Sequence, residues 1–299
     1  MTNEIGRVLT AMVTPFDADG AVDYPAVGEL ARALIASGND GLVVTGTTGE
    51  APSLTNEEQI SVWRTVREAV GPDVPLVGGA STNATNESLP LVRACVDAGM
   101  DAVMLTVPYY NKPPQEGLVQ HFTTLAEATP LPCILYNVPS RTSLNMTAET
   151  TLRLAEVPNI IGIKEASGDF AQIEAILTGA PEGFLMWSGN DNDTEPMVEM
   201  GGYGVISVAG HLVARQIREM VYGAAEGRLD EARAIHERLL PFVDALFIES
   251  NPIPVKFALN EVGVRAGTLR LPLVPPSEAS QAAIREELAK HQIDVTVAV

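Results

Sequence analysis

Short runs of apolar residues alternate with longer segments of helical periodicity along most of this chain. In eight of these runs the hydrophobic residues are nearly continuous, a pattern typical of parallel strands that are buried on both faces. The runs are residues 8–13, 41–45, 75–79, 102–107, 133–138, 160–164, 184–188 and 204–208. Eight strand–helix units in succession predict an α/β protein built as a (β/α)8 TIM barrel.

The segments between the runs carry signals for helix starts. Residues 55–58 read TNEE, a capping-box pattern, and Asn86, Thr147 and Asp169 are each of a type that caps helices. An open doubly wound sheet is the alternative fold. Such sheets usually carry a glycine-rich phosphate loop after their first strand, and residues 14–17 (TPFD) do not resemble one.

Helical patterns continue beyond the eighth run. The predicted helices span residues 215–226, 229–247, 254–262 and 276–290. The first of them can complete the barrel, so we expect the barrel to comprise residues 1–226. We expect residues 227–299 to form an appended C-terminal helical segment that packs on the barrel and is too small to be an obvious second catalytic domain.

Composition narrows the class of function. Hydrophobic residues make up 46% of the 299 residues, and the formal net charge is −19. Such a charge repels phosphate backbones and anionic lipids, so neither nucleic acid nor a membrane is an expected partner. Cys95 and Cys133 lie in apolar patterns and are predicted to be core residues rather than a disulfide framework. Without a signal peptide or an apolar run of about 18 residues, a cytoplasmic protein is expected.

Lys164 is the most informative polar residue, because it ends an apolar run and is one of only four lysines. Burial disfavours the charged form of an amine, and a neutral amine attacks ketones, so this setting indicates Schiff-base chemistry. The alternative is a lysine whose ammonium group reaches solvent at the end of a strand.

Other polar side chains follow the predicted strands, where the active sites of (β/α)8 barrels lie. They include Thr47 and Thr48, the pair Tyr109–Tyr110, Tyr136 and Arg141, and the segment 188–191. Each has a structural alternative: a turn for the threonines, packing for the tyrosines and a surface ion pair for the arginine. Their convergence on one end of the barrel favours a site.

Metal chemistry has little support in the sequence. The four histidines are scattered, without the spacing of a zinc site. Residues 190–193 (NDND) resemble part of a calcium loop but lack its glycine and terminal glutamate. The glycines at 201, 202 and 204 do not form a dinucleotide fingerprint. We therefore expect no metal site.

Five motifs together resemble the dihydrodipicolinate synthase family. They are GTTGE at residues 46–50, PYYNKP at 108–113, YNVPSRT at 136–142, GIKEA at 162–166 and ESNPIPVK at 249–256. The first and fourth alone would indicate only the wider superfamily of class I pyruvate aldolases, which includes N-acetylneuraminate lyase. The arginine-containing motif is the one that resembles the synthases.

The resemblance implies an enzyme of lysine and diaminopimelate biosynthesis that condenses pyruvate with aspartate semialdehyde to 4-hydroxy-tetrahydrodipicolinate. It implies that Lys164 forms an imine with pyruvate and that Tyr136 acts beside it as the acid and base. Thr47 and Tyr110 would complete a proton relay, with Tyr110 arriving from a neighbouring subunit of a tight dimer. A homodimer, or a homotetramer built as a dimer of dimers, is therefore expected.

The resemblance also implies how the substrates are held. Thr48 would bind the carboxylate of pyruvate, and Arg141 the carboxylate of the semialdehyde. The backbone carbonyl of Ile206 would face the imine, and Gly189 belongs to the same substrate-binding set. Since the imine itself is the electron sink, no cofactor is expected.

Some members of the family are inhibited by lysine at a dimer interface, and this chain departs from the pattern of that site. Asn83, Glu87 and Tyr109 match it, but Asn56 stands at the position of a histidine. Weak or absent inhibition by lysine is therefore expected. Two other functions remain open, namely a lyase of the same superfamily that acts on sugar acids and a catalytically silent paralogue that binds pyruvate.

Overall fold

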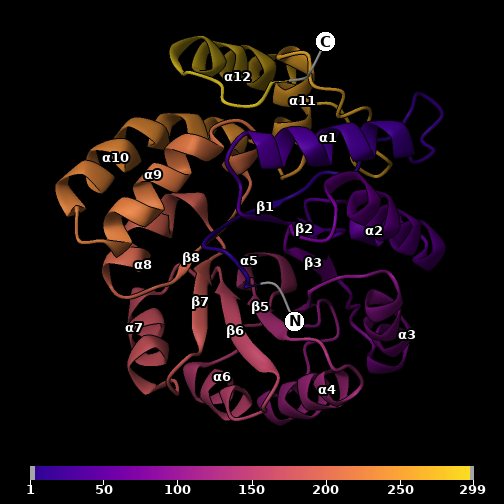
Figure 1. Ribbon diagram of the computed structural model, residues 1–299, viewed down its shortest axis with the longest axis vertical. Helices are drawn as coiled ribbons and strands as arrows, with labels where there is room; N and C mark the ends of the chain where they lie inside the picture. Colours follow the sequence, from indigo (N-terminus) through magenta and orange to yellow (C-terminus); the bar gives the residue numbers. More distant parts are fainter. Residues whose placement is uncertain (1–3, 297–299) are drawn as a thin grey trace.

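The eight apolar runs form one closed barrel of parallel strands in sequential order, as the computed structural model of residues 4–296 shows (Figure 1). This confirms the predicted fold. The strands are β1 (Val8–Ala11), β2 (Gly41–Val44), β3 (Leu76–Gly79), β4 (Ala102–Thr106), β5 (Cys133–Asn137), β6 (Ile160–Glu165), β7 (Leu185–Ser188) and β8 (Gly204–Ser207). Several of the apolar runs are one or two residues longer than the strands they form. The polar residues that come after these runs lie in loops at the carboxyl end of the barrel.

Helices surround the barrel and continue beyond it. Those between or after the strands are α1 (Tyr24–Ala36), η1 (Ala51–Ser53), α2 (Asn56–Val70), α3 (Thr85–Asp97), α4 (Gln115–Glu127), α5 (Pro139–Thr142), α6 (Ala148–Ala155), α7 (Phe170–Gly179), η2 (Asp191–Asp193), α8 (Thr194–Glu199), η3 (Ala209–His211) and α9 (Ala214–Ala225). The C-terminal helices are α10 (Leu229–Leu246), α11 (Ile253–Glu261) and α12 (Glu278–Lys290). Helix α10 packs on α9, and α12 packs on α10 and α11 (Figure 1).

Three of the four predicted helix caps are confirmed. Thr55 and Glu58 form the reciprocal capping box at the start of α2, and Thr147 and Asp169 cap α6 and α7. The prediction for Asn86 is wrong, because α3 begins at Thr85 with Ala84 as its N-cap residue. A serine organises this turn instead: the Ser88 hydroxyl accepts from the Thr82 amide at 2.9 Å and donates to the Ala84 carbonyl at 2.9 Å.

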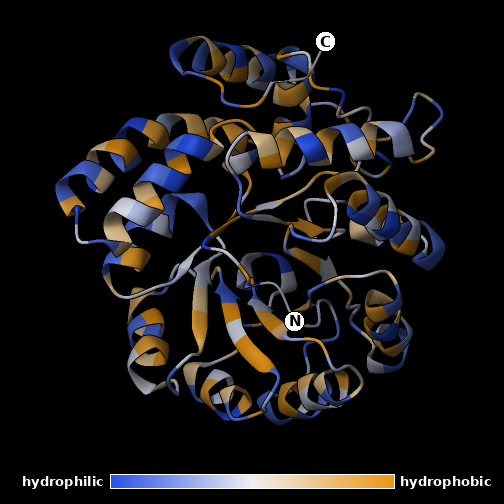
Figure 2. Cartoon of the chain, in the orientation of Figure 1, coloured by the Kyte–Doolittle hydropathy of each residue, from blue (hydrophilic) through white to orange (hydrophobic). Residues whose placement is uncertain are grey.

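The core has two parts. The larger lies between the strands and the surrounding helices, and the smaller fills the inside of the barrel, where Leu9, Val43, Met104 and Trp187 pack together. Figure 2 shows hydrophobic residues running along β5 and β6, while hydrophobic and hydrophilic residues alternate in patches along the helices. Because side chains fill the interior, a ligand can enter the barrel only at an end.

Both cysteines lie in the core, as the sequence predicts. Cys95 and Cys133 are buried free thiols, and burial raises the pKa of Cys133 to about 12. Within residues 4–296, no helix is long and apolar enough to cross a membrane.

Candidate active site

A cavity of about 150 Å³ lies at the carboxyl end of the barrel, lined by residues of strands β1, β4, β5 and β6 and of the loops after β2, β5, β7 and β8. Its lining includes most of the predicted catalytic and substrate-binding side chains, together with one asparagine from the C-terminal segment. These residues are Thr47, Thr48, Tyr136, Arg141, Lys164, Gly189 and Asn251. The carboxyl ends of all eight strands lie at the same end of the barrel. The fold thus brings together groups that are up to about 200 residues apart in the sequence.

Lys164 and Tyr136 are neighbours because β5 and β6 pair in parallel with these two residues opposite each other. The Nζ atom of Lys164 lies 4.4 Å from the centre of the Tyr136 ring. In β6 the side chains alternate between the two faces of the sheet, so Lys164 faces the barrel interior while Glu165 faces the helices, where it accepts from Asn137 and Gln172. The pairing register therefore fixes the amine beside the phenol.

Burial shifts the pKa values of both groups, and in opposite directions. The side chain of Lys164 is only 4% exposed. Burial lowers its pKa to about 8, the nearby Asp191 carboxylate opposes this shift, and the Arg141 guanidinium adds to it. Burial raises the pKa of Tyr136 to about 12, an effect that Arg141 opposes. At neutral pH the tyrosine therefore keeps its proton, while the lysine loses its proton far more readily than an exposed one.

The loop after β2 presents the two threonines. Both Thr45 and Glu50 adopt left-handed backbone conformations, with φ of 54° and 57°, and the Glu50 amide donates to the Thr47 carbonyl at 3.0 Å. The resulting tight turn places Thr47 and Thr48 on the wall of the cavity. The Thr48 hydroxyl accepts a 2.8 Å hydrogen bond from the side-chain amide of Asn251.

Arg141 lies on the short helix α5, directly after β5. Its Nη2 atom donates to the backbone carbonyl of Asn251 at 3.0 Å. This bond uses one of the five donors of the guanidinium, which lines the cavity and can offer others to an anionic ligand. Asn251 was missed by the sequence interpretation, although it lies within the motif at residues 249–256. Its Oδ1 atom is buried and has no hydrogen-bond partner among the described residues.

Gly189 provides space beside the lysine. A Cβ atom at this position would lie 3.1 Å from Lys164 Cε and 2.6 Å from Ala166 Cβ, so any larger residue would crowd the amine. Ile206 is fully buried in β8 and packs inside the barrel. Among the described residues it is Val208, two positions further on, that lines the cavity. The predicted role of the Ile206 carbonyl therefore stays a prediction.

Asp191 is a second residue that the sequence interpretation did not assign to the site. It is buried, and its carboxylate accepts from the Ser207 hydroxyl and from the amides of Val208 and Ala209 at 2.9 and 3.2 Å. Burial raises its pKa, which these hydrogen bonds and Lys164 oppose. Residues 190–193, which resemble part of a calcium loop, thus contain a carboxylate that accepts hydrogen bonds from backbone amides.

Tyr110 lies apart from the other predicted catalytic residues. Its side chain is 88% exposed, and its backbone is left-handed with φ of 73°. Within one chain, Tyr110 therefore does not reach the cavity that holds Tyr136 and Thr47. Its place in a relay requires a second subunit and stays a prediction.

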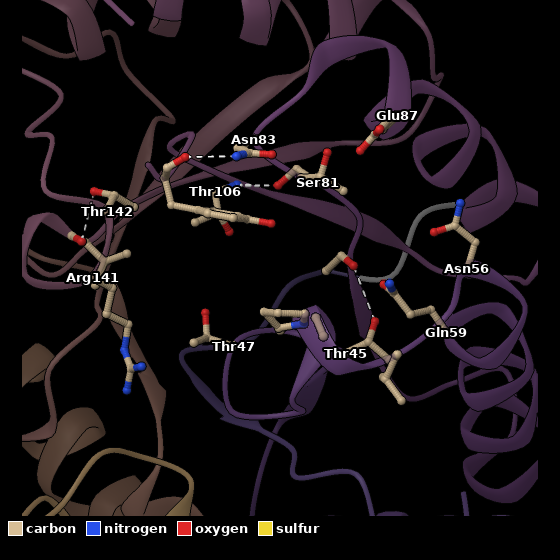
Figure 3. Close-up of a pocket in the computed structure, with 18 residues that line it drawn as sticks. Thr45, Thr47, Asn56, Gln59, Ser81, Asn83, Glu87, Thr106, Arg141 and Thr142 are labelled. Atoms are coloured by element: carbon tan, nitrogen blue, oxygen red, sulfur yellow. Dashed lines mark hydrogen bonds between the residues drawn. The ribbon is translucent and has the colours of Figure 1, made fainter. Parts of the chain in front are cut away.

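A second, larger cavity of about 340 Å³ adjoins the first and shares Thr47 and Arg141 with it. It brings together all four residues of the predicted regulatory set: Asn56, Asn83, Glu87 and Tyr109. Figure 3 shows Asn56, Gln59 and Glu87 on one side of this cavity and Arg141 on the other. The Asn83 amide donates to the Tyr109 carbonyl at 3.1 Å, which fixes that side chain.

Comparison with known proteins agrees with this geometry. The model of the dihydrodipicolinate synthetase family matches residues 4–291. A 4-hydroxy-tetrahydrodipicolinate synthase of Dehalococcoides mccartyi is 51% identical over 294 residues, which cover 98% of this chain and 99% of that protein.

Solved structures give the same result. A dihydrodipicolinate synthase of Bacillus anthracis superposes with a TM-score of 0.94 at 40% identity, over 97% of this chain and 99% of the other. The enzyme of Cyanidioschyzon merolae, solved with lysine bound, has a TM-score of 0.93 at 41% identity, over 95% and 97% of the two chains.

Proposed function

This chain belongs to the dihydrodipicolinate synthetase family, and we propose that its reaction proceeds through an imine between Lys164 and pyruvate. The enzyme condenses pyruvate with L-aspartate 4-semialdehyde to 4-hydroxy-tetrahydrodipicolinate, the compound in its relatives' names, in lysine and diaminopimelate biosynthesis. The observation that carries the mechanism is the buried amine of Lys164, whose pKa is lowered to about 8, beside the ring of Tyr136.

The reaction begins when the neutral amine of Lys164 attacks the ketone carbon of pyruvate, and loss of water gives the imine. Removal of a proton from the pyruvate methyl group then gives an enamine. The enamine carbon adds to the aldehyde carbon of the semialdehyde, whose oxygen takes up a proton. Finally, the amine of the semialdehyde attacks the imine carbon, closes the ring and releases Lys164 for another turnover.

Tyr136 serves as the proton donor and acceptor beside the imine. With its pKa raised to about 12, the phenol does not remain ionised at neutral pH, so it must pass each proton onward rather than store a charge. The hydroxyls of Thr47 and of Tyr110 from a second subunit form the relay. This role of Tyr110 requires a homodimer, or a homotetramer of two such dimers, and the exposed Tyr110 side chain is available for such an interface.

The substrate carboxylates occupy opposite parts of the cavity. Thr48, held by Asn251, binds the carboxylate of pyruvate, and the guanidinium of Arg141 binds that of the semialdehyde through charge-assisted hydrogen bonds. Gly189 leaves the space that the adduct needs, and the carbonyl of Ile206 faces the imine. The protonated imine withdraws electrons from the methyl carbon, so the mechanism uses neither a metal nor an organic cofactor.

Two further assignments rest on the family rather than on the site. The biosynthetic role supports a cytoplasmic location. The cavity that contains Asn56, Asn83, Glu87 and Tyr109 corresponds to the regulatory set, but the amide of Asn56 cannot carry the positive charge available to a histidine. Weak or absent inhibition by lysine is the proposed consequence.

The substrate assignment is tested by product analysis. The purified enzyme is incubated with pyruvate and aspartate semialdehyde, and separately with N-acetylneuraminate, and the products are identified by mass spectrometry. We expect a cyclic C7 dicarboxylate from the first mixture and no cleavage in the second. Cleavage of the sugar acid without turnover of the semialdehyde would instead identify a sugar-acid lyase.

A further inference from the structure

The C-terminal segment reaches the loop after β2 through a buried ion pair. Lys256, on helix α11, has a side chain that is only 2% exposed, and its partner Glu50 is 1% exposed. The Nζ atom of Lys256 lies 2.6 Å from Glu50 Oε1 and donates at 2.6 Å to the carbonyl of Thr268. The ammonium group also lies 4.3 Å from the centre of the Phe16 ring. The proposed catalytic mechanism uses neither charge.

The second carboxylate oxygen of Glu50 is held from the same segment. It accepts from the backbone amide of Arg270 at 3.1 Å. The guanidinium of Arg270 in turn forms hydrogen bonds of 2.6 and 2.8 Å with Glu58, at the start of α2. Residues 256–270 therefore hold both oxygens of Glu50, in the middle of the segment that joins β2 to α2, and also bind Glu58 in the first turn of α2.

A gain in stability alone does not explain the buried ion pair between Lys256 and Glu50. Burial lowers the pKa of Lys256 to about 8, a shift that Glu50 opposes, so burying the ammonium has a cost that the ion pair must offset. Buried ion pairs can often be replaced by apolar residues without loss of stability. The location of Glu50 points instead to a role in geometry.

Glu50 ends the turn that carries the threonines. Its left-handed backbone and the hydrogen bond from its amide to the Thr47 carbonyl make it the last residue of that turn. The Thr14 hydroxyl holds the neighbouring Gly49 carbonyl at 2.7 Å. A shift of the Glu50 side chain would therefore be transmitted through two peptide units to Thr48.

The chain just before this helix holds Thr48 directly. Asn251, which lies just before α11, donates to the Thr48 hydroxyl and accepts from Arg141 through its carbonyl. Lys256 lies five residues further along the chain. The C-terminal segment thus contacts the turn at two points, through Asn251 at the Thr48 hydroxyl and through Lys256 of α11 at the Glu50 carboxylate.

We propose that Lys256 and Glu50 are positioning residues that hold Thr47 and Thr48 in the geometry required to bind pyruvate. This inference rests on the proposed role of Thr48 in binding the pyruvate carboxylate. It also makes the C-terminal segment a part of the active site. Breaking the pair should weaken the pyruvate half of the reaction selectively, because Arg141 is held through the backbone of Asn251 and not through the pair.

The test uses Glu50→Gln, which is isosteric, and Lys256→Met, which keeps an unbranched side chain that is one atom shorter and carries no charge. Imine formation is measured by borohydride trapping over a range of pyruvate concentrations, and kcat/KM is measured for each substrate. We expect the pyruvate concentration for half-maximal trapping to rise at least fivefold and kcat/KM for pyruvate to fall by a similar factor. The value of kcat/KM for the semialdehyde should change less than twofold.

Two controls separate positioning from general loss of stability. Arg67→Met breaks the ion pair between Arg67 and Asp101 at the opposite end of the barrel and should lower Tm without changing the pyruvate dependence. Thr48→Val reports on the proposed site and should raise the pyruvate requirement. If a single variant does not fold, the double variant Glu50→Gln/Lys256→Met, which leaves no unpaired buried charge, is expected to fold and to show the same increase.

The outcomes are distinguishable. If Thr48→Val raises the pyruvate requirement but the Glu50 and Lys256 variants behave like Arg67→Met, the positioning role is refuted and the proposed function stands. If Thr48→Val leaves the pyruvate requirement unchanged, the assignment of the pyruvate site is itself wrong. Equal losses of kcat/KM for both substrates in the Lys256 and Glu50 variants would also overturn the inference.

Discussion

Lys164 and Tyr136 occupy paired positions on adjacent strands, and the amine of the lysine lies 4.4 Å from the centre of the tyrosine ring. The two groups share one buried environment but respond to it in opposite ways. The pKa of the amine is lowered to about 8 and that of the phenol is raised to about 12. One environment thus prepares a nucleophile that is readily deprotonated and an acid that keeps its proton.

Removing the phenol hydroxyl tests the second half of this relationship. We expect Tyr136→Phe to fold normally, since the ring and its packing are kept, and to lower kcat by about 10²- to 10³-fold through the loss of acid–base catalysis. Steady-state kinetics checks this, with Tyr203→Phe as a matched control. Tyr203 donates to the Ile5 carbonyl at the other end of the barrel, so its hydroxyl should be dispensable for turnover. Equal rates for Tyr136→Phe and the wild type would exclude the role.

Replacement of Arg141 by alanine should affect the two substrates differently. We expect kcat/KM for aspartate semialdehyde to fall at least about 100-fold, because a charge-assisted partner of its carboxylate is lost. Borohydride trapping of pyruvate should be retained. Arg153→Ala, which removes an exposed arginine paired with Glu116, is the control and should change neither value. Loss of trapping with an unchanged KM for the semialdehyde would show that Arg141 has another role.

Burial of the Lys164 amine should destabilise the fold in a pH-dependent way. Its pKa is about 8 in the folded state against an ordinary value of 10.5. Below pH 8 the full cost of burying the charge is present, up to about 3 kcal/mol. Between these two pKa values the unfolded state keeps the proton that the folded state loses, so the cost decreases as pH rises, and it is absent above both.

Lys164→Met should therefore raise the free energy of unfolding at pH 7, and the gain should shrink towards pH 10. Denaturant unfolding at several pH values measures this. Lys290→Met removes an exposed lysine on α12 and should show no such pH-dependent gain. A Lys164→Met variant that is less stable than the wild type at pH 7, with no dependence on pH, would contradict the burial of a costly charge.

Lysine should inhibit this enzyme weakly or not at all. Asn56 offers an amide where the family resemblance implies an imidazole, and a misplaced polar partner leaves buried groups without hydrogen bonds. The measurement is a lysine titration of initial rates at subsaturating pyruvate. Asn56→His, compared in parallel, should increase the sensitivity. Half-inhibition of the wild type at submillimolar lysine would show that the asparagine is tolerated.

The fold could be predicted from the sequence because its signal is local and repeated. Each of the eight runs is buried on both faces, and in a barrel their carboxyl ends must converge, so the positions of Lys164, Tyr136 and Arg141 follow from the topology. The pairing register that sets Lys164 opposite Tyr136 is also a property of adjacent strands. The failed cap at Asn86 shows how weak a single polar residue is as a signal.

Contacts made by the C-terminal segment could not be predicted in this way. Asn251 and Thr48 are 203 residues apart, and Lys256 and Glu50 are 206 apart. Nothing local to either residue indicates such a pairing, because it depends on how the C-terminal segment packs against the loop after β2. Lys256 even resembles an ordinary helical lysine in the sequence, although it is among the most completely buried side chains of the described residues.

Covalent trapping of the imine tests the central claim most directly. The enzyme is incubated with pyruvate, reduced with borohydride, digested and mapped by mass spectrometry, with a reaction lacking pyruvate as the control. We predict one reduced three-carbon adduct per chain, located on Lys164, and none in a Lys164→Met variant. Stoichiometric labelling of Lys112 or Lys256 instead, or full turnover by the Lys164→Met variant, would contradict the account.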